Sequence, residues 1–107
     1  MLLDHKVNPR YAQLLPQHEV SHTQKMGWGE LLNGELIAAA EQEGFDVMIT
    51  ADKSKQYQQT ISNRKICIIV LNAPLITWPH IEPLAPQVNE ALRSLHPGAL
   101  RTISLEK

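Results

Sequence analysis

The sequence predicts one α/β domain over residues 1–107, a three-layer sandwich with a central, mostly parallel five-stranded sheet. The strongest observation is a pair of continuous apolar runs, Val47-Met48-Ile49 within FDVMIT and Ile66 to Val70 within RKICIIVL. Strands without polar alternation are buried on both faces, as in a parallel sheet that is covered by helices on each side. The second observation is that candidate strands and helices alternate along the chain. A length of 107 residues with 43% hydrophobic content suits a single core.

Before the first of these runs, local signals predict two strands and a helix. MLLD, at 1–4, is a short apolar segment that forms a strand only if it is buried among neighbours. Asn8-Pro9 predicts the start of a helix, because proline is favoured at the first helical position, and Pro16 ends that helix. HEVSHT, at 18–23, is a weaker strand candidate.

The remaining elements follow from helical periodicity and from proline. The segment 30–44 is the best candidate helix, and Gly44 suits its end; its apolar face comprises Leu32, Leu36, Ala39 and Ala40. A short helix is expected between the third and fourth strands. Apolar residues from Ile81 to Leu95 predict a later helix, whose regular part begins near residue 86 because prolines occupy positions 83 and 86. ALRTISL, at 99–105, is the last candidate strand.

Composition limits the functional classes. The net charge is −1 at pH 7, so charge alone gives no reason to expect a nucleic-acid binder. Cys67 is the only cysteine, which excludes an intrachain disulfide and a cysteine-based zinc site. No apolar stretch approaches the roughly 18 residues that a membrane span needs, and the first residues lack the pattern of a signal peptide. We therefore expect a cytoplasmic protein with no membrane partner.

Two aspartates that follow candidate strands are the first candidates for a functional site. Asp4 ends the first strand and Asp52 follows the third. In open α/β sheets, ligands bind at the carboxyl ends of the strands, where the strand order reverses. If the order is 2-1-3-4-5, the reversal lies between these two strands, whose backbones are about 4.8 Å apart. The two carboxylates can then share one cation.

Glu35 is the candidate for a third acid. It lies at the border of the predicted apolar face of the helix 30–44, where a side chain can reach towards the sheet edge. Three neighbouring carboxylates repel one another, and a hard divalent cation such as Mg²⁺ or Mn²⁺ removes that repulsion. Each acid also has a structural interpretation. Asp4 and Asp52 are the types of residue that close turns or cap helices, and Glu35 is equally suited to a solvated helix surface.

Four segments resemble, in order and spacing, successive blocks of the PIN-like nuclease families: MLLDHKVNPR, HEV, MGWGELLNGEL and GFDVMITADKSKQYQQ. The likeness runs from residue 1 to about residue 72 and is greatest to small PIN-like proteins assigned as toxins in toxin–antitoxin pairs. Its most specific element is Thr50-x-Asp52 after a buried strand, combined with Leu-Leu-Asp4. The resemblance implies a parallel-sheet sandwich and a metal-dependent ribonuclease that hydrolyses phosphodiesters with a metal-activated water. It also implies catalytic and metal-binding roles for Asp4, Asp52 and Glu35.

The partners expected from the resemblance are an RNA substrate and a small antitoxin protein. Candidate substrate contacts follow Asp52, because Lys53 and Lys55 can hold phosphates, Tyr57 can stack on a base, and Gln58 can contact substrate or water. A solvated, charged loop is the alternative interpretation of this segment. A homodimer is a further expectation, because the C-terminal helix and Trp78 can present apolar surface to a second copy of the chain.

The sequence departs from the family in ways that define a second functional hypothesis. KSKQYQQ follows Asp52 where many relatives have another aspartate, and Asn33 and His5 stand at positions where acids are usual. The absent fourth acid and the near-neutral net charge favour a catalytically inactive PIN-like interaction module. A phosphoacceptor domain of the response-regulator kind is disfavoured, because it needs an acidic pair after the first strand.

Overall fold

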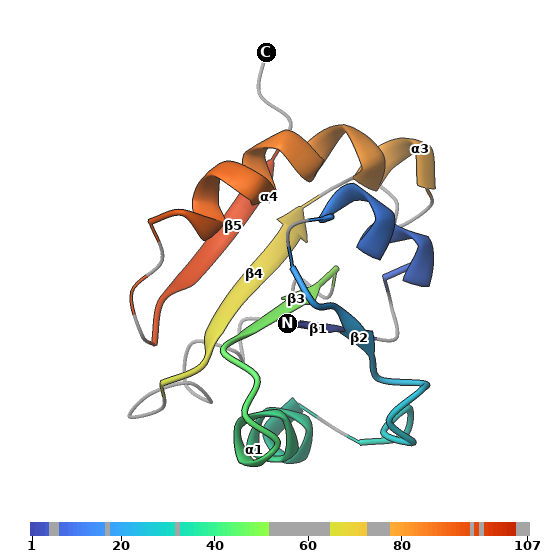
Figure 1. Ribbon diagram of the computed structural model, residues 1–107, viewed down its shortest axis with the longest axis vertical. Helices are drawn as coiled ribbons and strands as arrows, with labels where there is room; N and C mark the ends of the chain where they lie inside the picture. Colours follow the sequence, from blue (N-terminus) through green and yellow to red (C-terminus); the bar gives the residue numbers. More distant parts are fainter. Residues whose placement is uncertain are drawn as a thin grey trace.

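The computed structural model describes residues 1–4, 7–16, 18–31, 33–51, 65–72, 78–94, 96 and 98–104, which form an α/β sandwich around a five-stranded sheet (Figure 1). The predicted fold class is confirmed, and all the strand pairings are parallel. The strand order is β2-β1-β3-β4-β5, which is the order that the site prediction assumed. The strands are β1 Leu2–Leu3, β2 Ser21–His22, β3 Val47–Thr50, β4 Cys67–Asn72 and β5 Leu100–Ser104.

Helices cover both faces of the sheet. Figure 1 shows α1 on one side and α3 and α4 on the other, and the packing of their side chains agrees. The helical elements are η1 Pro9–Leu14, α1 Asn33–Gln42, α3 Trp78–Ile81, η2 Glu82–Leu84 and α4 Ala85–Leu92. The short helix expected between β3 and β4 lies outside the described residues. No helix in the described part of the chain is both long and apolar enough to cross a membrane.

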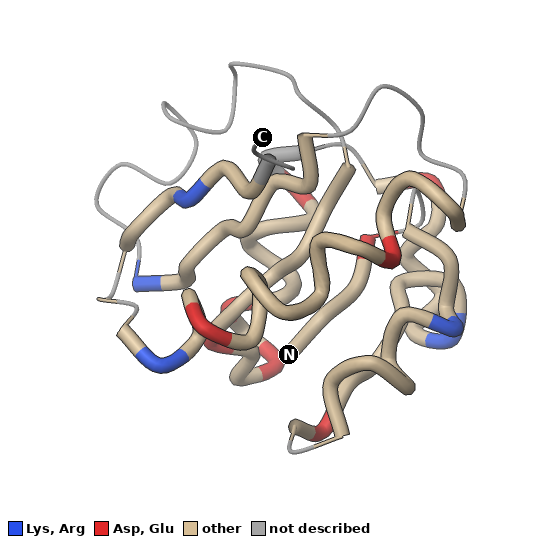
Figure 2. Tube along the Cα trace, turned by 90° about the horizontal axis from the view of Figure 1, so that it is seen from above, with Lys and Arg blue, Asp and Glu red and all other residues tan. Residues whose placement is uncertain are grey.

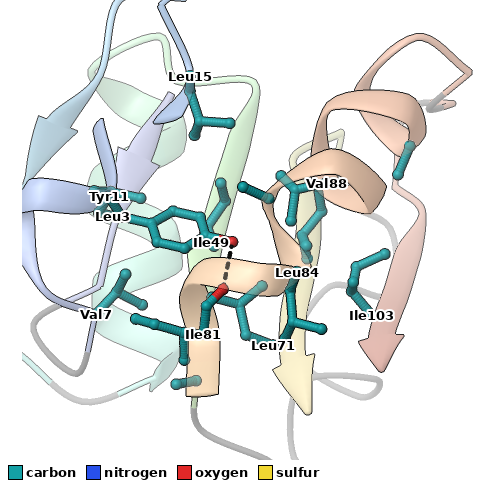
Figure 3. Packing of buried hydrophobic residues seen from close by; sticks show 14 residues of the cluster. Leu3, Val7, Tyr11, Leu15, Ile49, Leu71, Ile81, Leu84, Val88 and Ile103 are labelled. Carbon is teal, nitrogen blue, oxygen red and sulfur yellow. Dashed lines mark hydrogen bonds between the residues drawn. The ribbon is translucent and has the colours of Figure 1, made fainter. Parts of the chain in front are cut away.

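Successive residues of each central strand pack into two different cores. Met48 of β3 packs towards α1, whereas Ile49 packs towards η1 and α4. Burial on both faces explains why β3 and β4 have no polar alternation. The core beneath α1 contains the buried residues Leu2, Leu36, Ile37, Ala40, Met48, Ile66, Ile68 and Val70. The opposite core, shown in Figure 3, includes Leu3, Val7, Tyr11, Leu15, Ile49, Ile69, Leu71, Ile81, Leu84, Val88 and Ile103.

Tyr11 connects the two helical segments of the second core. Its side chain is fully buried, and its hydroxyl donates a hydrogen bond of 3.1 Å to the Ile81 carbonyl oxygen at the end of α3 (Figure 3). Its ring meets the Trp78 ring edge-on at a centroid distance of 6.1 Å. The Arg10 guanidinium lies 4.5 Å from the centre of the Trp78 ring. Burial raises the pKa of Tyr11 above its ordinary value, because the charged phenolate is disfavoured away from water.

Three helices differ in detail from the sequence prediction. The segment from Pro9 to Leu14 is a 3₁₀-helix, in which Asn8 accepts a hydrogen bond of 2.9 Å from the Arg10 N–H. α1 begins at Asn33 and not at residue 30, and it ends before Gly44, whose φ of 92° suits glycine. The predicted C-terminal helix is divided into α3, η2 and α4, because prolines interrupt its hydrogen-bond ladder.

The buried hydroxyl of Tyr11 predicts a stability that depends on alkaline pH. At pH 7, Tyr11→Phe should lower the free energy of unfolding by about 1–3 kcal/mol, because the Ile81 carbonyl loses its donor. The folded-state pKa of Tyr11 is raised, so the unfolded chain loses this proton first, at about pH 10. The stability contributed by the neutral phenol is therefore complete below about pH 10 and declines above it. Urea unfolding at pH 7 and pH 10.5 should show a smaller wild-type advantage at the higher pH; an equal advantage at both would contradict this account.

Candidate functional site

Asp4 lies at the carboxyl edge of the sheet, directly after β1. Its backbone N–H donates to the Ile49 carbonyl oxygen at 2.9 Å, so its main chain is still paired with β3. β1 lies between β2 and β3. The strand order reverses here, because β2 is added on one side of β1 and the later strands are added on the other side. Asp4 is only 2% exposed, which is unusual for a carboxylate. The sequence prediction placed Asp4 correctly at the switch point, where ligands bind in open α/β sheets.

The Thr50 hydroxyl is the best-defined partner of the Asp4 side chain. The register pairs Leu3 with Ile49, so Asp4 and Thr50 are neighbours in the next row of the sheet. Thr50 Oγ1 donates a hydrogen bond of 2.6 Å to Asp4 Oδ2. Thr50 is itself fully buried, and a short bond to a carboxylate away from water is a strong one. This contact fixes the orientation of the Asp4 carboxylate.

The main chain that follows Asp4 is also held in place. The Val7 N–H donates to the Asp4 carbonyl oxygen at 2.9 Å, which closes a turn after β1. His22 Nε2 lies 2.8 Å from the Val7 carbonyl oxygen, and His22 Nδ1 accepts from the Gln24 N–H at 3.1 Å. His22 therefore joins the turn after β1 to the end of β2. Because both of its ring nitrogens are used in this way, His22 is a structural residue.

Glu35 lies on the helix that covers the same face of the sheet as the Asp4 side chain. Leu2 and Asp4 are two residues apart, so they share a face, and Leu2 packs in the core beneath α1. The Glu41 carboxylate in the last turn of α1 accepts hydrogen bonds from the N–H groups of Lys65 and Ile66, just before β4. The end of α1 therefore lies at the amino edge of the sheet. Glu35, six residues earlier, is about 9 Å further along the helix axis towards the edge of Asp4.

The exposure of Glu35 differs from the sequence prediction. Among the α1 residues whose burial is described, Leu36, Ile37 and Ala40 are buried, whereas Ala39 is only half-buried. The predicted face omitted Ile37, and Glu35 lies outside the observed one as an exposed residue of the first turn. Its carboxylate is therefore solvated in the structure, and a role at Asp4 requires the side chain to extend towards the sheet edge.

The other predicted site residues lie outside the described residues. These are Asp52 and the four candidate substrate contacts Lys53, Lys55, Tyr57 and Gln58. Among the residues that are described, no group of three or more His, Cys, Asp or Glu side chains is arranged to hold a metal ion.

The described donors fit a hard divalent cation in their chemical type. Carboxylate oxygen atoms are the protein ligands that Mg²⁺ and Mn²⁺ prefer. Asp4 provides such a carboxylate, oriented by the Thr50 hydroxyl in the way that outer partners orient metal ligands. Glu35 provides a second, solvated carboxylate at the same end of the sheet.

The Lys and Arg residues in the described part of the chain do not gather into one basic face that could bind nucleic acid. Figure 2 shows Lys and Arg positions towards opposite sides of the trace, with Asp and Glu positions between them. This mixed distribution agrees with the net charge of −1. A basic surface for nucleic acid therefore depends on residues outside the described ranges.

Sequence reasoning missed two threonine hydroxyls beside Asp4. Thr50 belongs to the Thr50-x-Asp52 motif, but its hydrogen bond to Asp4 follows only from the register of β1 and β3. Nothing in the sequence around Thr23 indicated that it lies beside Asp4. It lies at the end of β2, where it is fully buried and where its N–H donates to the Leu3 carbonyl oxygen at 3.0 Å.

Comparison of the chain with models of protein families, with curated proteins and with solved structures found no match. The interpretation of the site therefore rests on its geometry and on the resemblance of its sequence motifs to the PIN-like nucleases.

The bond between Thr50 and Asp4 predicts a measurable loss of stability. Thr50→Val keeps the shape of the side chain but removes the donor from a buried carboxylate, which should lower the free energy of unfolding by about 1.5–3 kcal/mol. Thr50→Ser keeps the hydroxyl and should lose less. Urea unfolding at pH 7 measures both effects. A valine variant as stable as the wild type would show that this hydrogen bond contributes nothing to the fold.

Proposed function

We propose that the protein is a metal-dependent ribonuclease of the PIN-like kind, in which Asp4, Glu35 and Asp52 hold Mg²⁺ or Mn²⁺. The observation that carries the proposal is the burial of the Asp4 carboxylate at the switch point of the sheet, with the Thr50 hydroxyl 2.6 Å from it. Burying a charged carboxylate is costly, so buried carboxylates are paired with other groups or coordinate metal ions. Carboxylates at this position in the fold suit a cation-dependent reaction on an anionic substrate.

The residues of the chain have distinct parts in this proposal. Asp4 is the fixed ligand, because its backbone and its side chain are both hydrogen-bonded to β3. Glu35 is the adaptable ligand, since its side chain is solvated in the first turn of α1. A bound divalent cation would activate a water molecule and stabilise the negative charge that develops on the phosphate. Lys53, Lys55, Tyr57 and Gln58 remain the proposed contacts to the RNA.

We propose RNA as the substrate and a small antitoxin as the partner because the sequence motifs resemble those of PIN-like toxins. A cytoplasmic location agrees with that proposal. A homodimer is compatible with it, although Trp78 already packs against Tyr11 and Arg10 within the chain. The alternative is a catalytically inactive interaction module on the same fold. The absent fourth acid after Asp52 and the near-neutral net charge of −1 favour that alternative.

Metal binding should stabilise the wild-type protein and should depend on Asp4. At a free Mn²⁺ concentration 100 times the dissociation constant, mass action adds about 2.7 kcal/mol to the free energy of unfolding. That gain corresponds to a rise of several degrees or more in the unfolding midpoint for a domain of this size. Asp4→Asn should lose the rise, because an amide lacks the charge that holds the cation. Asp52→Asn should lose it as well.

Asp46→Asn is the matched control for this thermal titration. Asp46 is exposed and precedes β3, so it lies at the amino edge of the sheet, away from Asp4. This variant should keep the full Mn²⁺-dependent rise. A wild-type midpoint that does not respond to Mn²⁺ would overturn the metal-site proposal.

RNA cleavage distinguishes the nuclease from the inactive module. The wild type should cleave single-stranded RNA in the presence of Mn²⁺ or Mg²⁺ and should stop when EDTA removes the cation. Asp4→Asn should fall to the background rate, whereas Asp46→Asn should retain activity. Metal binding without cleavage of any tested RNA would favour the interaction module.

A further inference from the structure

The hydroxyl of Thr23 is buried and has no hydrogen-bond partner within the part of the chain that the structure describes. The residue has no exposed surface, and among the residues that the structure describes no group donates to or accepts from its Oγ1 atom. Buried hydroxyls without partners are rare in native proteins, because each has lost its water and gained nothing in return.

Thr23 is the neighbour of Asp4 on the side opposite Thr50. The register pairs Leu3 with His22, and the Thr23 N–H continues the ladder by donating to the Leu3 carbonyl oxygen at 3.0 Å. The next residue of each strand, Asp4 and Thr23, is therefore in the same row. Residues in one row of a parallel sheet point to the same face. The two threonines thus flank the Asp4 carboxylate, one from β2 and one from β3.

The loop after β2 holds the backbone of Thr23 firmly. The Thr23 carbonyl oxygen accepts a hydrogen bond of 2.9 Å from the Trp28 N–H, and Gly27 adopts a φ of 77° that lets the chain turn back. Trp28 then packs edge-on against Phe45, with ring centroids 6.3 Å apart. A side chain on such a backbone can change its rotamer while its Cα stays in place.

Thr50 demonstrates that a threonine in this row can reach the carboxylate. It donates to Asp4 Oδ2 from the neighbouring strand at 2.6 Å. Thr23 has the equivalent position on the other neighbouring strand, but its hydroxyl has no hydrogen-bond partner among the described residues. A ligand that draws the Asp4 carboxylate into its binding geometry would give that hydroxyl an acceptor. The free energy of that new hydrogen bond would then add to the binding of the ligand.

We propose that Thr23 is a positioning residue of the Asp4 site, whose hydroxyl donates to the Asp4 carboxylate when a divalent cation is bound. Thr50 and Thr23 then hold the carboxylate from both sides, as outer partners commonly do for metal ligands. The inference rests on the proposed function, since it assumes that Asp4 binds a cation. It goes beyond that function by assigning a role to a residue of β2 that the acidic motifs do not include.

The test compares the stability of the metal-free protein with its affinity for Mn²⁺. Thr23→Val replaces the hydroxyl by a methyl group of similar size. The metal-free variant should unfold at the same temperature as the wild type or at a higher one, because it no longer buries an unpaired hydroxyl. Its affinity for Mn²⁺, measured by isothermal titration calorimetry, should fall by about tenfold. Thr23→Ser, which keeps the hydroxyl, should bind within about threefold of the wild type.

Thr102→Val is the control for the exchange of threonine for valine. Thr102 is exposed on β5 and pairs with Val70 in the same row of the sheet, at its far edge. This variant should keep the wild-type affinity for Mn²⁺.

Three results would decide against the inference or its basis. Equal Mn²⁺ affinity of Thr23→Val and the wild type would overturn the role of Thr23 and leave the proposed function standing. A metal-free Thr23→Val protein that is less stable than the wild type, or fails to fold, would show that the hydroxyl already has a stabilising partner. A wild type that does not bind Mn²⁺ would overturn the proposed function, and the inference with it.

Discussion

The proposed site depends on the burial of one carboxylate, that of Asp4, at the carboxyl edge of the sheet beside the central strand β3. Asp4 follows a strand of only two residues, yet it is 2% exposed. Removing a carboxylate from water is strongly unfavourable unless hydrogen bonds compensate. Thr50 provides one such bond, and the N–H of Asp4 remains part of the ladder with β3. The short β1 strand is therefore held in the sheet by polar contacts as well as by Leu2 and Leu3.

The helices that cover the sheet are oriented so that the first turn of α1 lies at the same edge of the sheet as Asp4. α1 runs back from the carboxyl edge to the amino edge, where Glu41 accepts the N–H groups that precede β4. This arrangement leaves the first turn of α1, with Glu35, at the end where Asp4 lies. On the opposite face, Tyr11 joins η1 to α3 through the Ile81 carbonyl. The helical layers on the two faces of the sheet are therefore held by separate sets of contacts.

The sequence was sufficient for the fold because its strongest patterns are local. The run from Ile66 to Val70 predicted a strand buried on both faces, and Gly44 correctly predicted the end of α1. The 3₁₀ form of η1 and the division of the last helix were harder to predict. In both places proline limits the main-chain hydrogen bonds, and tertiary packing decides which form the remaining bonds take.

The candidate site was predicted less completely than the fold, because it depends on register. The position of Asp4 could be inferred from the end of an apolar segment together with an assumed strand order. The partnership of Asp4 with Thr50, and the place of Thr23 beside it, needed the pairing of Leu3 with Ile49 and His22. A shift of one residue would have turned either threonine to the other face. The exposure of Glu35 likewise depends on how α1 is rotated about its axis.

The most direct test of the account is the position of Mn²⁺ in crystals of the wild-type protein, read from its anomalous scattering. We expect a peak at the carboxyl edge of the sheet, within coordination distance of the Asp4 carboxylate. Crystals soaked in saturating Mn²⁺ that show no peak at Asp4, or show peaks only at other acidic residues, would contradict it.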